Sequence, residues 1–434
     1  MKNNNLIASL LHFLEASPTP FHAVKNMATE LSKAGFQELA EKDRWQLNKN
    51  ERYYAIRGGS SLIAFSPAGQ DPSETGLRMV GAHTDSPCLK IKPRPEIHSN
   101  GYFQLGVEVY GGALLNPWFD RDLSIAGRVT YIDQADEIRD TLVDYREPIA
   151  VIPNLAIHLD RDANKNRTVN PQQHLPAILY RHDNDKIPEF RSMLLSQIKA
   201  GKEDDNARSV LDFDLCLYDA QPPRITGLNQ EFLASARLDN LLSCYIGLRS
   251  MIDSGCPLPS ALVCNDHEEV GSQSAIGAQG PLLRSVLERW CGSSENYLRA
   301  IDQSMLISAD NAHAIHPNYA DRHDQNHSPL LNSGPVIKFN SNQRYATNAT
   351  TSAVYRRLCQ DNDIPVQVFV SRTDLACGTT IGPLTAGEVG VQTLDVGIPQ
   401  FGMHSVRETC GTDDVDYLYR SLIAFFRSDR LIGK

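Results

Sequence analysis

The chain has 434 residues, of which 41% are hydrophobic and 22% are charged, and its formal net charge at pH 7 is −10. This length is enough for two or three domains with buried cores, and the composition is typical of globular rather than disordered proteins. The acidic balance argues against nucleic acid or an anionic membrane as the main partner.

The first predicted element is a short amphipathic helix over residues 6–14. Its apolar run is too short to span a bilayer, and its flanks lack a signal-peptide cleavage site. The nine cysteines are scattered without a Cys-x-x-Cys pair, which argues against a disulfide framework and against a thiolate zinc site. We therefore expect a cytoplasmic protein that does not bind membranes.

The pattern of predicted elements changes at about residue 95. Residues 1–95 carry helical patterns followed by apolar strands, the last of them over residues 76–85. Residues 96–224 carry short strands rich in Gly, Tyr and Val, a polar loop at residues 159–174 and a helical stretch near residues 191–206. This segment lacks strand–helix–strand alternation, so we expect an inserted α+β domain.

Strand–helix alternation starts near residue 225 and continues to the C-terminus. It predicts a mostly parallel sheet with helices on both faces. We therefore expect one α/β domain, formed by residues 1–95 and 225–434 and interrupted by the inserted segment. In chain order, its later elements are a helix at 239–251, a strand at 261–264, a helix at 281–290, a strand at 304–308, a helix at 350–361, strands at 366–370 and 392–397, and a helix at 415–427.

Ionisable residues gather where the predicted strands of this domain end. In open α/β sheets, functional groups collect just beyond the carboxyl ends of the strands. Four clusters follow strands, and a fifth residue begins a helix on the same side. The clusters are His83 with Asp85, Glu268 with Glu269, Asp310 with His313 and His316, and His404, and the helix residue is Asp239.

Each cluster alone has an ordinary structural explanation. A histidine at a strand end is usually hydrogen-bonded within the fold, and Asp239 alone would be a first-turn acid favoured by the helix dipole. A glutamate pair such as Glu268 and Glu269 is most often solvated. The convergence of five clusters on one rim of the sheet is the observation that favours a functional site.

A site for two divalent cations uses this whole set of side chains. Zinc-type cations take imidazole and carboxylate ligands, and a pair of them needs a bridging carboxylate and about two more ligands each. His83 and Asp310 would serve one ion, His404 and one glutamate the other, with Asp239 between them. The second glutamate is then a general base toward water, and spacing alone leaves open which of the two it is. Asp85 would fix the His83 tautomer, with a turn cap as its alternative role.

The segments around these residues resemble the signature segments of the aspartyl aminopeptidases, a family of co-catalytic zinc exopeptidases that remove an N-terminal acidic residue. The resemblance covers essentially the whole chain, and the segments follow the family's order. They are GAHTDSPCLKIKP, SARLDNLLSCY, DHEEVGSQSAIGA, SADNAHAIHPNY, GPVIKFNSNQRYAT, DLACGTTIGP and FGMHSVRE.

The resemblance implies a role for each of these charged residues. It assigns Glu268 as the general base, and we count Asp85, from its position after His83, as the second catalytic residue. Zinc is the implied metal, although Mn²⁺ and Co²⁺ also suit such ligands. The ligands of the two cations would be His83, Asp239, Glu269, Asp310 and His404.

The resemblance also implies a substrate pocket and an assembly. Lys338 would hold the acidic side chain of the substrate, with Tyr345 and His313 nearby, because a charge in an apolar pocket needs a partner. Without the resemblance, Lys338 reads as a strand-end lysine with its amine in solvent. The inserted segment would be a dimerisation domain whose His158 reaches the neighbouring subunit's active site, and dimers would form a homo-dodecamer that admits short peptides.

Three other functions stay open at this point. Branches of the family prefer neutral N-terminal residues, so an aminopeptidase with that preference is one alternative. A two-metal deacylase or carboxypeptidase is another, and it would need cations for the C-terminal carboxylate of its substrate. A non-enzymatic assembly or cargo protein is the third, but it would be expected to lose the base or several ligands, and none is missing here.

Overall fold

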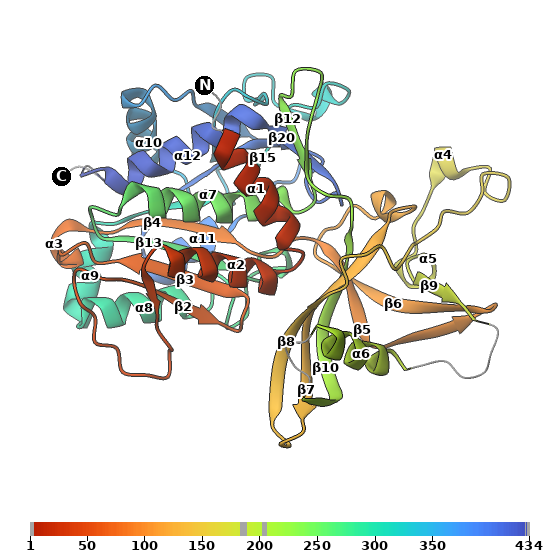
Figure 1. The fold of residues 1–434 in the computed structure, drawn as a ribbon. Helices are drawn as coiled ribbons and strands as arrows, with labels where there is room; N and C mark the ends of the chain where they lie inside the picture. Colours follow the sequence, from red (N-terminus) through yellow and green to blue (C-terminus); the bar gives the residue numbers. More distant parts are fainter. Residues whose placement is uncertain (1–3, 183–188, 202–205, 430, 432–434) are drawn as a thin grey trace. The chain divides into compact units, whose positions relative to one another are not determined.

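The computed structural model describes residues 4–182, 189–201, 206–429 and 431 of the chain (Figure 1). The chain divides into two compact units. Unit 1 comprises Met1–Ser86, Pro223–Met403 and Glu408–Lys434, and unit 2 comprises Pro87–Pro222 and His404–Arg407. The first boundary follows Ser86 rather than residue 95, because residue 95 lies inside β5 (Cys88–Ser99), a strand of unit 2.

Unit 1 is built on a nine-stranded sheet. Its central strands β13, β4, β14 and β18 run parallel to one another, whereas the pairs β2–β3, β3–β13 and β16–β18 are antiparallel. The sheet is therefore mostly parallel, as predicted. In spatial order its strands are β1 (Phe36–Glu38), β2 (Arg52–Arg57), β3 (Ser61–Ser66), β13 (Ser260–Asn265), β4 (Arg78–His83), β14 (Met305–Ala309), β18 (Gln392–Gly397), β16 (Val336–Phe339) and β17 (Gln367–Val370).

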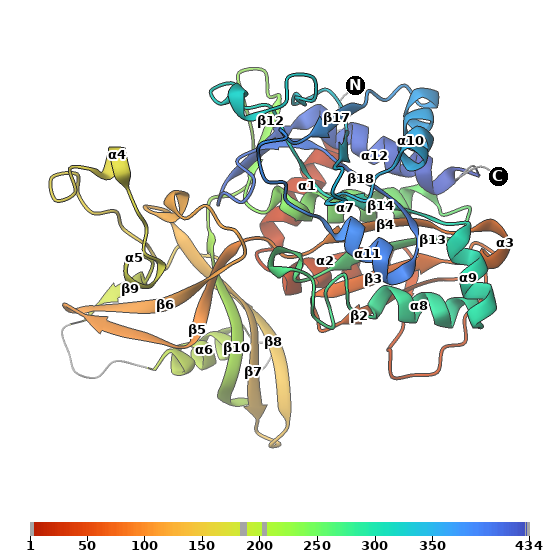
Figure 2. The same cartoon turned by 180° about the vertical axis from the view of Figure 1, so that it is seen from behind.

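Apolar side chains of the central strands alternate between the two faces of this sheet. In β13, Leu262 and Cys264 belong to one core cluster, whereas Ala261 and Val263 belong to another. Helices cover both clusters, which confirms the α/β class (Figures 1 and 2). The first cluster includes residues of α1 (Asn4–Ala16), α2 (Pro20–Lys33), α7 (Leu238–Ser254), α10 (Ala349–Asp361) and α12 (Thr412–Arg427), and the second includes residues of α8 (Leu282–Cys291), α9 (Ser294–Asp302) and α11 (Ile381–Val389).

A second, five-stranded sheet in unit 1 is absent from the sequence prediction. Its strands have two to four residues each, too short for an alternation pattern to be recognised. Two of its strands follow closely on β14 and β18, so they extend the chain beyond the carboxyl ends of those strands. In spatial order the strands are β11 (Arg224–Thr226), β12 (Phe232–Ser235), β20 (Glu408–Gly411), β19 (Pro399–Phe401) and β15 (Ala312–His313).

Unit 2 contains a six-stranded sheet in which every strand pair is antiparallel. Helix α6 (Phe190–Ala200) contributes Phe190, Leu194 and Ile198 to the core of this unit. It accounts for the helix predicted near residues 191–206, of which residues 202–205 lie outside the described part of the chain. In spatial order the strands are β8 (Ile138–Asp144), β7 (Leu123–Asp133), β10 (Ala207–Asp219), β5, β6 (Tyr102–Tyr110) and β9 (Ala177–Arg181).

The predicted polar loop of unit 2 contains two single-turn helices, α4 (Ala163–Asn166) and α5 (Pro171–His174). The remaining short helix of unit 1 is α3 (Pro72–Thr75). Among the helices that the structure describes, none combines the length and the apolar composition needed to cross a membrane.

Candidate metal centre

Three adjacent strands bring most of the expected polar side chains to one edge of the main sheet. β4 ends at His83, the 3₁₀ helix η2 (Glu268–Val270) follows β13, and Asp310 directly follows β14. Because β13, β4 and β14 are parallel neighbours, their carboxyl ends lie at the same edge. Residues that are far apart in the sequence are thereby brought together.

Asp239 reaches the same edge from the first turn of α7, which is irregular. Arg237 precedes the helix in a left-handed conformation, and Asp239 and Asn240 depart from helical dihedral angles. The backbone of Asp239 is held on both sides. Its carbonyl accepts from Ser86 Oγ at 2.5 Å, and its N–H donates to the carboxylate of Glu408 at 3.0 Å.

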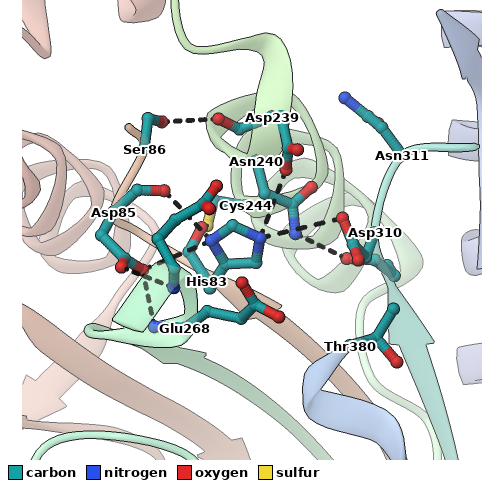
Figure 3. Close-up of polar contacts among 12 residues, drawn as sticks. His83, Asp85, Ser86, Asp239, Asn240, Cys244, Glu268, Asp310, Asn311 and Thr380 are labelled. Atoms are coloured by element: carbon teal, nitrogen blue, oxygen red, sulfur yellow. Dashed lines mark hydrogen bonds and ion pairs between the residues drawn. The ribbon is translucent and has the colours of Figure 1, made fainter. Parts of the chain in front are cut away.

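His83 lies at the centre of the cluster and is 1% exposed (Figure 3). Its Nε2 atom is 3.3 Å from Asp239 Oδ1 and 3.7 Å from Asp310 Oδ1. Ligand atoms of these three residues all lie within 4.8 Å of one another, and the same holds for the set His83, Glu268 and Glu269. The imidazole therefore belongs to two overlapping groups of potential metal ligands.

Asp85 contacts both the imidazole and the glutamate pair. Nδ1 of His83 lies 3.0 Å from the carbonyl oxygen of Asp85 and 3.3 Å from its carboxylate. A carbonyl oxygen can only accept, so Nδ1 carries a proton, and whenever the ring is neutral its lone pair is on Nε2. The Asp85 carboxylate also accepts from the backbone N–H groups of Glu268 and Glu269, each at 3.1 Å. Asp85 therefore contacts the His83 ring and also caps the backbone turn at Glu268 and Glu269.

Burial raises the pKa of Glu268 to about 7, and the nearby carboxylates act in the same direction, whereas the imidazole of His83 opposes them. A carboxyl group that titrates near neutral pH is suited to accept and return a proton. With the protein groups alone around it, Glu268 therefore holds a proton more tightly than an exposed glutamate does.

The residues present fit a pair of divalent cations. Negative charge is concentrated at this edge of the sheet, and Lys338 supplies a single positive charge beside it. Divalent cations would offset the repulsion among the carboxylates, and imidazole nitrogen and carboxylate oxygen are donors that zinc accepts. The carboxylates that gather around His83 are those of Asp85, Asp239, Glu268, Glu269 and Asp310.

Lys338 is buried in β16, with 2% of its surface exposed, so the interpretation of its amine as a solvated group is wrong. Its Nζ donates to Asp310 Oδ2 at 3.3 Å and to the carbonyl of Asn311 at 3.1 Å, and it lies 5.2 Å from the centre of the Tyr345 ring. The protein atoms around His313, together with the charge of Lys338, lower the pKa of that imidazole to about 4. Lys338 and Tyr345 are therefore neighbours, and the charge of Lys338 is close enough to His313 to favour its neutral form.

A cavity of about 300 Å³ lies beside this group. It is wide enough for one amino-acid side chain and combines aromatic walls with polar groups. The residues that line it include His313, His323, Phe369, Arg372, Cys377 and Gln400.

Two expected site residues belong to unit 2. His404 has a left-handed backbone, its Nδ1 lies 3.2 Å from the carbonyl of Gly112, and its own carbonyl accepts the N–H of Leu114 at 3.0 Å. His158 lies in an exposed segment with two exposed leucines.

Three buried polar residues beside the cluster do not stand out in the sequence. Asn311, Gln400 and Glu408 form hydrogen bonds with the segments that carry Asp239 and Asp310. Asn311 and Glu408 lie within the quoted motifs ADNAHA and FGMHSVRE, directly after or close to an expected ligand. Their position in these motifs is a signal that would have identified Asn311 and Glu408. Their residue types give no such signal, because amide and carboxylate side chains are usually exposed.

Known proteins that are similar to this chain are described as aminopeptidases. The family model described as aminopeptidase I zinc metalloprotease (M18) matches residues 13–426. The chain is 55% identical over 426 residues to the probable M18 family aminopeptidase 2 of Ectopseudomonas mendocina (strain ymp), covering 98% of this chain and 99% of that protein. It is 54% identical to the protein of the same name in Pseudomonas entomophila (strain L48), with the same coverage.

Solved structures of related proteins have the same fold. A chain of the Ape4 and Nbr1 complex superposes with a TM-score of 0.94 at 37% identity, covering 98% of this chain and 85% of that one. The mApe1 dodecamer of S. cerevisiae gives 0.83 at 30% identity, with 97% and 96% covered. The M18 aminopeptidase of Thermotoga maritima gives 0.84 at 22% identity, with 98% and 97% covered, which supports the fold alone. With a family match over nearly its whole length, this chain belongs to the aminopeptidase I zinc metalloprotease (M18) family.

Proposed function

We propose that this protein is a two-metal aminopeptidase that removes N-terminal aspartate or glutamate from peptides, with Glu268 as the general base. The observation that carries the proposal is the arrangement around His83, whose Nε2 atom faces Asp239 and Asp310 while Glu268 and Glu269 lie within ligand distance. The relatives described as probable M18 aminopeptidases support the reaction class.

We assign the five metal ligands as follows. His83 and Asp310 would hold one cation, Glu269 and His404 would hold the other, and Asp239 would bridge them. Two bound divalent cations would polarise the scissile carbonyl and lower the pKa of the attacking water. Zinc fits both the donor types and the family, and Mn²⁺ or Co²⁺ would fit the same donors.

The chain's own residues would carry the proton transfers. Asp85 fixes the backbone of Glu268, so that its carboxyl group faces the same space as the proposed ligands. Glu268 would accept a proton from water during attack on the peptide carbonyl and return it to the departing amine. Asp85 also holds His83 with Nε2 available to a metal.

Lys338, Tyr345 and His313 would bind the acidic side chain of the substrate. The three lie together beside Asp310, and the ammonium group of Lys338 would offset the charge of a substrate carboxylate. The free amine of the substrate would meet carboxylates of the metal centre, which is how the enzyme would select an N-terminus.

A preference for neutral N-terminal residues is the second candidate, and one observation favours it. Lys338 is buried and already donates to Asp310 and to the carbonyl of Asn311. In that case Lys338 would serve only to orient Asp310. A substrate carboxylate would have to share the ammonium group with Asp310 for the acidic preference to hold.

We also propose that the protein acts in the cytoplasm as a homo-oligomer, with dimers formed through unit 2 and assembled into a dodecamer. Leu155 and Leu159 are exposed on either side of His158, so this segment offers apolar surface to a second subunit. His158 would then enter the active site of the neighbouring subunit. The S. cerevisiae mApe1 dodecamer is a relative with this stoichiometry.

A panel of substrates tests the proposed reaction. Asp-, Glu- and Ala-p-nitroanilide would be compared with N-acetyl amino acids, using protein whose zinc content is measured in parallel. We expect the protein to hydrolyse Asp- and Glu-p-nitroanilide faster than Ala-p-nitroanilide. Cleavage of the acetylated compounds alone would instead identify a deacylase.

A further inference from the structure

A chain of buried hydrogen bonds connects the backbone of Asp239 to the residue that follows Asp310. The N–H of Asp239 donates to Glu408 Oε2 at 3.0 Å. The other oxygen of that carboxylate, Oε1, accepts from Gln400 Nε2 at 3.4 Å. The carbonyl oxygen of the Gln400 side chain then accepts from Asn311 Nδ2 at 2.9 Å. We call these three side chains, Glu408, Gln400 and Asn311, the relay.

Two further hydrogen bonds join the same backbone segments. Asn311 Nδ2 also donates to the carbonyl of Leu238 at 2.9 Å, and Asn240 Nδ2 donates to the carbonyl of Ala309 at 2.9 Å. The residues before and after Asp239 are thus hydrogen-bonded to the residues after and before Asp310. Figure 3 shows Asn240 and Asn311 near the two carboxylates.

The relay is costly to bury. Its three side chains are each 2% exposed, and polar groups in such surroundings cost free energy unless their hydrogen bonds are made. Apolar residues of similar size could fill the same space without that cost. Gln400 on β19 pairs with Cys410 on β20, and Glu408 lies two residues before Cys410 on the same face of that strand, so the paired strands supply a frame for the relay. Because the relay is rigid, costs free energy to bury and lies beside the proposed metal centre, we interpret it as a positioning element.

We propose that Glu408 and Gln400 are positioning residues that hold the carboxylates of Asp239 and Asp310 at the spacing that a metal requires. They act through the Asp239 backbone and through Asn311. The inference rests on the proposed metal centre, and it extends that centre to side chains that are not themselves ligands. Partners of this kind typically contribute about 10- to 100-fold to metal affinity or activity.

Each hydrogen bond of the relay has a defined donor and acceptor. Exchanging the Glu and Gln side chains at positions 408 and 400 therefore tests the relay. Glu408→Gln would turn an amide toward the amide of Gln400, so that two donors face each other. Gln400→Glu would place two carboxylates in contact in a buried position. The double variant Glu408→Gln/Gln400→Glu restores the three hydrogen bonds of the relay. Gln at 408 would accept from the Asp239 N–H and donate to Glu at 400, whose second oxygen would accept from Asn311.

Zinc affinity of the metal-free protein is the primary measurement, made by competition with a chromophoric chelator, and urea denaturation of the same samples reports stability. We expect each single variant to bind zinc about 10- to 100-fold more weakly. We expect the double variant to recover most of that loss, and kcat/KM to follow zinc affinity.

Asp414→Asn is the matched control. Asp414 is a buried carboxylate of unit 1 that accepts the backbone N–H groups of Asn332 and Gly334 at 2.6 and 2.8 Å, and neither belongs to the proposed metal centre. This variant should lose stability while its zinc affinity stays at the level of the unchanged protein.

Single variants that bind zinc as tightly as the unchanged protein would overturn the inference. So would a double variant that regains stability without regaining zinc affinity, because the relay would then be structural only. If the unchanged protein binds no zinc and cleaves no free-amino substrate, the proposed function fails first. If one single variant does not fold, the other single variant and the double variant still decide the question.

Discussion

His83 Nε2 lies 3.3 Å from Asp239 Oδ1, although the two residues come from the end of a central strand and the irregular start of a helix. Neither atom is accessible enough to be solvated, since the two residues are 1% and 3% exposed. In the proposed centre both residues would be ligands of one cation. The predictions below follow from this relationship and from the residues that hold it in place.

Substitution of either residue should remove metal. We expect Asp239→Asn to lose most of the zinc from both positions, because a bridging carboxylate serves both cations. Total zinc per chain after dialysis is the measurement, with the Asp414→Asn variant as a control for general destabilisation. Two zinc ions retained per chain would show that Asp239 is not the bridge.

Substitutions of the two adjacent glutamates should differ in their effects on zinc content and on kcat. Glu268→Gln should keep near-normal zinc content and lose about 10²- to 10⁴-fold in kcat, as expected when a general base is removed. Glu269→Gln should instead lose zinc along with activity. Both quantities would be measured on the same preparations. The opposite pattern would mean that the roles of the two residues are exchanged.

Lys338 should determine the choice of substrate if the acidic preference holds. Lys338→Met keeps the apolar stem and removes the charge, so it should reduce kcat/KM for Asp-p-nitroanilide far more than for Ala-p-nitroanilide. Lys338→Arg, which keeps the charge, should retain part of the preference. An equal loss on both substrates would indicate that Lys338 only orients Asp310, with which it already pairs.

Asp414 should make folding stability depend on pH. Burial is the main cause that raises the pKa of Asp414 to about 7 from an ordinary value of 3.8, against the opposing N–H groups of Gly334 and Asn332. The folded protein therefore holds this proton more tightly than the unfolded chain does. The resulting stabilisation is complete below about pH 4 and is lost as the pH rises through 7.

The size of this loss of folding stability follows from the pKa shift of Asp414. Each pKa unit corresponds to about 1.4 kcal/mol, so between pH 5 and pH 8 the loss is on the order of 2 kcal/mol. Because Asp414→Asn cannot titrate, the unfolding free energy of the unchanged protein minus that of the variant should fall by this amount over the same range. Urea denaturation at the two pH values measures it. A difference that stays constant or rises with pH would contradict the assignment.

The architecture of unit 1 was predictable wherever strands were long enough to show a pattern. The strand predicted at residues 261–264 is β13, and the helix predicted at 281–290 is α8, because continuous apolar runs and helical periodicity identify such elements. The five-stranded sheet was missed, since two to four residues carry no period. His404–Arg407 belong to unit 2 through contacts that the sequence around them does not reveal.

The part of the candidate site that lies at the carboxyl ends of strands was predictable from the sequence. His83, Glu268 and Asp310 converge because β4, β13 and β14 are adjacent, which follows from α/β architecture once the strands are identified. The burial of Lys338 was not predictable from its strand-end position, because it depends on the ion pair with Asp310. Asn311 and Glu408 lie in motifs with expected ligands, but the relay was missed because its hydrogen bonds join residues that are far apart in the sequence.

Anomalous X-ray scattering at the zinc edge, from crystals of the zinc-loaded Glu268→Gln variant, tests the central claim most directly. We predict two zinc peaks, with Asp239 within bonding distance of both, about 2.0–2.2 Å, and with His83 bound to one of them through Nε2. A map in which no zinc lies within bonding distance of either His83 or Asp239 would contradict the two-metal centre.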